Sequence, residues 1–103
     1  MADAQSILHM TNTINTPSIA SAATALAANN ARSAWMIQNL GTNALFVLMG
    51  SGASTSVFHT VLKAGTGNDD GSGGSISQEA GTVYTGIITI AGTSPRYVVT
   101  EQS

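Results

Sequence analysis

Two histidines are the first residues to consider for catalysis or metal binding. His9 lies near the N-terminus and His59 within a predicted strand, and the chain contains no cysteine. A zinc site needs three or four cysteine, histidine or carboxylate ligands, and no carboxylate stands at ligand spacing from either histidine. Ser51, Ser54 and Ser56 precede His59, but no G-x-S-x-G sequence or suitably placed aspartate accompanies them. We therefore expect neither catalytic residues nor a metal site.

The one acidic cluster lies in a glycine-rich stretch, NDDGSGG, at residues 68–74. Loops of aspartate and glycine can bind calcium, but this stretch matches neither the EF-hand pattern nor a nonapeptide repeat. The overlapping GTGNDDG, at residues 65–71, lacks the lysine and the serine or threonine of a phosphate-binding loop. The cluster is therefore predicted to be a solvated turn, and no cofactor is expected.

Charged side chains are scarce in this chain. They make up 8% of its 103 residues, with a net charge of −2, against roughly a quarter in average soluble domains. The three basic residues are scattered along the sequence, so we expect no basic patch and no nucleic-acid binding. Small neutral side chains suit a protein packed within an assembly, although an ordinary Thr/Ser-rich β-domain has a similar composition.

The length and the apolar runs limit the class of protein further. A chain of 103 residues supports one domain with a limited core. The longest apolar run, residues 44–49, is far shorter than the ~20 residues of a membrane-spanning helix. The N-terminus lacks the basic and continuous apolar regions of a signal peptide. We expect a soluble protein that does not bind membranes.

From residue 32 onward the pattern is that of β-strands. Residues 33–39 alternate, which places Trp35 and Ile37 on one face and Met36 on the other. Trp35 can belong to the core or anchor a partner at the surface; its apolar neighbour Ile37 favours the core. Residues 44–49 are apolar on both faces, so we expect a central strand covered by the core on one side and by another sheet or subunit on the other.

Three later segments are also predicted to be strands. In residues 57–62, alternation places Phe58 and Leu62 on one face and Val57 and Val61 on the other. The remaining predictions are strands at residues 83–90 and 96–101, a short pairing at residues 75–79 and an exposed loop at residues 63–75.

The first 31 residues are harder to assign. Residues 1–17 mix isolated apolar residues with threonine, asparagine and glutamine, and no helix cap organises them. We expect an extended arm, which either frays or orders against a neighbouring subunit. The alanine-rich residues 18–31 fit a helix by spacing, but alternation and the strands that follow favour a strand at residues 23–27. The sequence thus predicts an all-β fold: a single small antiparallel β-sandwich, jelly-roll-like, over residues 18–103, with an extended N-terminal arm over residues 1–17.

Four stretches resemble small β-sandwich virion proteins of tailed bacteriophages. They are ARSAWMIQNLGTNALFVLMG, LKAG, VYTGIITIAGTS and RYVVTE, at residues 31–50, 62–65, 83–94 and 96–101. In that group a strand reading roughly R-x-x-x-x-I-Q-N precedes G-T-N and an apolar strand, and a late Y-x-G-x-I strand follows. The resemblance spans about residues 24–101 and rests on strand and turn patterns. The long loop at residues 63–75 is a departure from the simplest members.

The resemblance implies a capsid decoration (cement) protein, often trimeric. Such a protein would bind the major capsid protein and copies of itself at capsid subunit junctions, on the virion surface, after synthesis in the host cytoplasm. A tail or head-fibre component, or a receptor- or carbohydrate-binding module, is the alternative. The interface residues that we predict are Ile7, Leu8, Met10 and Ile14 in the arm and Met36, Phe46 and Leu48 in the strands.

Overall fold

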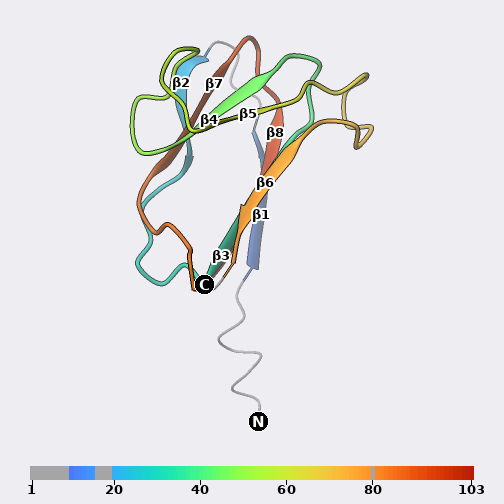
Figure 1. The fold of residues 1–103 in the computed structure, drawn as a ribbon. Helices are drawn as coiled ribbons and strands as arrows, with labels where there is room; N and C mark the ends of the chain where they lie inside the picture. Colours follow the sequence, from blue (N-terminus) through green and yellow to red (C-terminus); the bar gives the residue numbers. More distant parts are fainter. Residues whose placement is uncertain (1–9, 16–19, 80) are drawn as a thin grey trace.

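Eight β-strands form two antiparallel sheets in the computed structural model, which describes residues 10–15, 20–79 and 81–103 (Figure 1). Sheet A contains, in spatial order, β1 (Met10–Asn15), β8 (Tyr97–Gln102), β3 (Ala34–Asn39) and β6 (Ser75–Gln78). Sheet B contains, in spatial order, β2 (Ala20–Leu26), β7 (Ile88–Gly92), β4 (Leu45–Met49) and β5 (Thr60–Leu62).

The strand order is that of an eight-stranded jelly roll. β1 pairs with β8, β2 with β7, β3 with β6 and β4 with β5, so the chain behaves as one long hairpin wrapped into two sheets. The further pairs β3–β8 and β4–β7 join the halves of each sheet. The prediction of an all-β antiparallel sandwich of jelly-roll type is confirmed.

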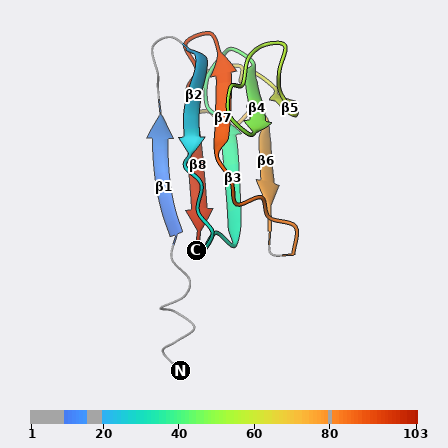
Figure 2. The ribbon, with the colours of Figure 1, turned by 90° about the vertical axis from the view of Figure 1, so that its left-hand side faces the viewer.

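The core lies between the two sheets, which are stacked face to face (Figure 2). In β3, Trp35 and Ile37 are buried while Met36 between them is 39% exposed, as the alternation predicts. The buried cluster draws side chains from five strands: Trp35, Ile37, Leu45, Val47, Leu62, Ile88, Ile90, Tyr97 and Val99. Burial of these side chains is the main stabilising contribution of the fold.

The N-terminal segment differs from the predicted arm. Met10–Asn15 is β1, which pairs along its whole length with β8 at one edge of sheet A. This part of residues 1–17 is therefore a strand of the sandwich, while residues 1–9, 16 and 17 lie outside the described residues. The strand expected at residues 23–27 is present and begins earlier, as Ala20–Leu26.

Two predicted strands are shorter than expected. β5 begins only at Thr60, because Ser54 and Val57 close a turn through reciprocal backbone hydrogen bonds of 2.9 and 3.3 Å. The prediction that Phe58 and Leu62 share one face of a strand is therefore wrong: Phe58 precedes the strand and is 39% exposed, whereas Leu62 is buried. The strand predicted at residues 83–90 begins only at Ile88.

The segment before β7 is held by side chains instead of a neighbouring strand. The buried Arg32 guanidinium donates from Nη1 to the carbonyl oxygens of Tyr84 and Gly86, at 2.8 and 3.0 Å. Its Nη2 donates to the Ala27 carbonyl at 2.6 Å, and its Nε donates to Glu101 Oε2 at 2.8 Å. One side chain thus ties β8 to two loops at this end of the sandwich.

Candidate functional site

The side chains of His59 and Ser54, considered for catalysis, have structural roles, whereas His9 lies outside the described residues. Nδ1 of His59 accepts a hydrogen bond from the Met49 backbone N–H at 3.0 Å. Oγ of Ser54 accepts from the backbone N–H groups of Ser56 and Val57, at 3.2 and 3.0 Å. These contacts fix the turn between β4 and β5. Residues 10–15, 20–79 and 81–103 contain no group of three or more histidine, cysteine or acidic residues that could hold a metal ion.

The two adjacent aspartates are engaged by donors of the protein itself. Asp70 accepts from the hydroxyl of Ser72, from the Ser72 backbone N–H at 2.9 Å and from the Thr66 hydroxyl at 2.8 Å. These hydrogen bonds lower the pKa of Asp70 to about 2. Asp69 accepts two hydrogen bonds from Arg96, at 2.6 and 2.7 Å, which lower the pKa of Asp69 and raise that of Arg96. The loop uses both carboxylates to hold its own shape.

Trp35 belongs to the core, which decides between the two roles considered for it. Its side chain is 2% exposed, and its indole Nε1–H donates to Gln78 Oε1 at 3.0 Å. The same oxygen accepts from the Tyr84 backbone N–H at 2.8 Å. Trp35 is therefore not available at the surface to bind a carbohydrate or another partner.

The four predicted interface residues of the arm are only partly within the described residues. Ile7 and Leu8 lie outside them. Met10 and Ile14 belong to β1, where the register places them opposite Gln102 and Val98 of β8. Their role at an interface stays a prediction.

The three predicted interface residues in the strands do not form one surface. Met36 lies on the outer face of sheet A, since its neighbours Trp35 and Ile37 are buried in the core. Phe46 and Leu48 are on the outer face of sheet B, because they alternate with the buried Leu45 and Val47. The sandwich therefore separates Met36 from the other two, and two distinct surfaces must be considered.

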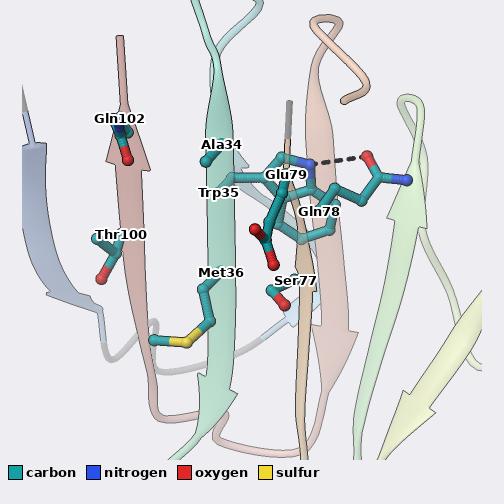
Figure 3. A pocket seen from close by; sticks show the side chains of 8 residues that line it. All are labelled: Ala34, Trp35, Met36, Ser77, Gln78, Glu79, Thr100 and Gln102. Atoms are coloured by element: carbon teal, nitrogen blue, oxygen red, sulfur yellow. Dashed lines mark hydrogen bonds between the residues drawn. The ribbon is translucent and has the colours of Figure 1, made fainter. Parts of the chain in front are cut away.

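A shallow groove crosses the outer face of sheet A. It has a volume of about 220 Å³ and runs over β8, β3 and β6 (Figure 3). Trp35 and Gln78 belong to its floor, with their polar atoms joined to each other. We call this surface the sheet A groove and define it by the residues that line it on the outer face: Ala34, Met36, Ser77, Glu79, Thr100 and Gln102. Three of these six side chains, those of Ala34, Ser77 and Thr100, are small, so the groove can accept a protruding side chain.

An apolar patch covers the outer face of sheet B near β5. Phe46 and Phe58 form an edge-to-face pair with ring centroids 5.0 Å apart and an interplanar angle of 62°. Val61 stands opposite Phe46 in the β4–β5 register and is 43% exposed, and Val57 is 51% exposed. We call this surface the sheet B patch: Phe46, Val57, Phe58 and Val61. The sequence predicted Phe46 as an interface residue but not Phe58. The reason is that residues 57–59, which lie outside β5, were predicted to belong to a strand.

Comparisons with known proteins bear on the fold. No family model and no curated protein matches the sequence. One solved structure, from work describing Bacillus endospore appendages as a novel family of disulfide-linked pili, is similar with a TM-score of 0.51. The two chains are 17% identical over 92% of this chain and 86% of that one, so the similarity is one of fold. In the part of the chain that the structure describes, no helix has the length and apolar character needed to cross a bilayer.

Proposed function

We propose that this chain is a non-enzymatic structural subunit that assembles with copies of itself in a virion, most specifically as a capsid decoration protein. The observation that carries the proposal is the presence of exposed apolar side chains on both outer faces of a sandwich that has very few charges. Large exposed apolar patches are uncommon on soluble monomers and mark interaction surfaces. A jelly-roll sandwich with an apolar patch on sheet B and an exposed Met36 on sheet A is suited to packing between neighbours.

The use of the charged side chains also favours a structural role. Arg32 is paired with Glu101, and Arg96 with Asp69, in contacts that connect segments of the same chain. Asp70 is bound by Ser72 within its own loop. These groups stabilise the subunit and are not gathered around a cavity in the way that a catalytic site requires.

Two lines of resemblance favour an assembled protein over a free module. The strand and turn patterns of the sequence resemble decoration proteins of tailed phages, which supports the virion role. The solved structure with a similar fold belongs to pili described as disulfide-linked. The present sequence has no cysteine, so it cannot form disulfides between its copies.

Two measurements test the proposal: size-exclusion chromatography with light scattering, and then co-sedimentation with capsids. The purified chain, at increasing concentration, is expected to give species larger than one 10.4 kDa chain. Labelled protein is then expected to co-sediment with phage capsids that lack it, and not with an unrelated particle of similar size. A chain that stays monomeric at every concentration and ignores capsids would contradict the proposal.

A further inference from the structure

The exposed apolar side chains gather on two opposite surfaces of the sandwich. Among the described residues, the large hydrophobic side chains that are exposed are Met36, Val57, Phe58 and Val61, at 39%, 51%, 39% and 43%. Met36 lies in the sheet A groove, and the other three belong to the sheet B patch. One face therefore presents a hollow and the opposite face presents a projecting aromatic group.

Two charged groups of opposite sign accompany these surfaces. Lys63 follows β5 and stands two residues after Val61, so alternation places it on the side of the sheet B patch. Glu79 follows β6 and lines the sheet A groove (Figure 3). Among the described residues neither side chain forms an ion pair, whereas both described arginines are paired. The two surfaces thus carry complementary charges that have no ion-pair partner within the described residues.

We propose that the sheet B patch of one copy packs into the sheet A groove of a second copy, with Lys63 of one facing Glu79 of the other. This inference rests on the proposed function and names its partner surface: a second copy of this chain. Phe58 is the side chain that enters the groove, and Met36 is the apolar surface that it meets.

The structure of the patch suits such an anchor. Phe46 packs against Phe58 at 5.0 Å and limits the positions that its ring can take. An aromatic side chain that is already held in place loses little conformational entropy on binding, and buried aromatic residues often dominate interface energies. The small side chains of Ala34 and Ser77 leave space for the ring on the outer face of sheet A, over the paired strands β3 and β6.

The two surfaces differ from each other, so the contact is heterologous. Repetition of a heterologous contact closes a ring or extends into a filament. The competing arrangement is an isologous dimer in which two sheet B patches meet and the groove has no role. The two arrangements give opposite results when one surface is blocked at a time.

Two single substitutions separate these arrangements. Phe58→Asp puts a charge in the patch and leaves the groove intact. Ala34→Arg fills the groove and adds a positive charge that would face Lys63 of the second copy. It leaves the patch intact. The matched controls are Thr24→Asp, on an exposed position of β2, and Ser75→Arg, on an exposed position of β6 that does not line the groove. Thermal unfolding confirms that each variant is folded.

Sedimentation velocity of the separate and mixed variants gives the decisive result. We expect the wild type and both controls to associate, and Phe58→Asp and Ala34→Arg each to remain monomeric. An equimolar mixture of these two variants should form a dimer that does not grow, because one intact patch meets one intact groove. If Ala34→Arg assembles as the wild type does, or if the mixture stays monomeric while the wild type assembles, the heterologous contact is wrong and self-assembly itself stands.

Charge reversal tests the same contact without altering the apolar surfaces. Lys63→Glu and Glu79→Lys should each weaken association about fivefold, as expected for one exposed ion pair. The double variant, with both charges exchanged, should recover most of the wild-type affinity. If the double variant instead shows the sum of the two weakening effects, Lys63 and Glu79 do not pair. This test does not depend on whether Ala34→Arg folds. A wild-type chain that never associates would overturn both this inference and the proposed function.

Discussion

At the scale of single residues, the few charged side chains of this protein act mainly within the chain. Arg32 is the most constrained: it is 3% exposed and its guanidinium donates to one carboxylate and three carbonyl oxygens. A buried charge is tolerated when it is paired and hydrogen-bonded, as Arg32 is here. Arg32 therefore replaces the strand pairing that the segment before β7 lacks.

Removal of the Arg32 guanidinium should be strongly destabilising. Arg32→Met leaves the partly buried Glu101 carboxylate and three carbonyl oxygens without their donor, and such losses cost about 3–5 kcal/mol. Urea denaturation measures the change. Arg96→Met is the matched control, because its ion pair with Asp69 is at the surface, and it should cost much less. Equal losses for the two variants would contradict a special role for Arg32.

Asp70 makes the stability of the protein sensitive to acid. Its pKa is about 2 in the folded protein, against an ordinary value of 3.8. A lowered folded pKa means that the carboxylate stabilises the fold above pH 3.8, and that this contribution is lost as the pH falls through about 2. NMR titration should give the low pKa directly. The Asp70→Asn variant has no carboxyl group at this position, so its free energy of unfolding should fall less than that of the wild type between pH 3.8 and about 2. An equal fall in both proteins would contradict the assignment of this acid sensitivity to Asp70.

At the scale of elements, β4 shows how one strand serves two purposes. Leu45 and Val47 are fully buried in the core, while Phe46 and Leu48 face outward on sheet B. The sequence predicted a strand with apolar side chains on both faces, and the second apolar face is the one that leads into the sheet B patch.

The two faces of sheet B should respond differently to truncation. Leu45→Ala removes a buried side chain and leaves a cavity, which typically costs about 2–5 kcal/mol. Val61→Ala removes a side chain that is 43% exposed, and surface changes of this kind usually stay within about 0.5 kcal/mol. Chemical denaturation of the monomeric Phe58→Asp background compares them without interference from assembly. A large loss for Val61→Ala would mean that the patch is part of the core.

Alternation along the sequence predicted β3 and β8, and a continuous apolar run predicted β4; each of these strands has one face buried in the core. Alternation failed to predict the structure of segments whose backbone N–H and C=O groups bond to distant side chains. Residues 83–87 have a strand-like composition, but Arg32 and Gln78 bind their polar groups instead. β1 was not assigned to the sandwich because its partner, β8, stands at the other end of the chain.

At the scale of the whole molecule, the jelly-roll order brings together the residues of both surfaces. The sheet A groove collects side chains from β3, β6 and β8, which are far apart in sequence. Sequence reasoning predicted Met36 as an interface residue but could not supply the groove around it, since that depends on the pairing of β3 with both β6 and β8. The fold thereby creates two different surfaces on a chain that has few charged side chains.

Association through these surfaces should depend only weakly on salt. The contact is mainly apolar, and one ion pair between Lys63 and Glu79 contributes the part that salt screens. Raising the salt concentration should weaken association of the wild type slightly. It should weaken association of the double charge-reversed variant to a similar extent. Complete dissociation at high salt would contradict an apolar contact.

Sedimentation equilibrium of the 103-residue chain most directly tests the proposal that this protein is a subunit of an assembly. We expect an average mass that rises with concentration above the 10.4 kDa of one chain, and that returns to the mass of one chain in Phe58→Asp. A mass of one chain for the wild type at every concentration would contradict it.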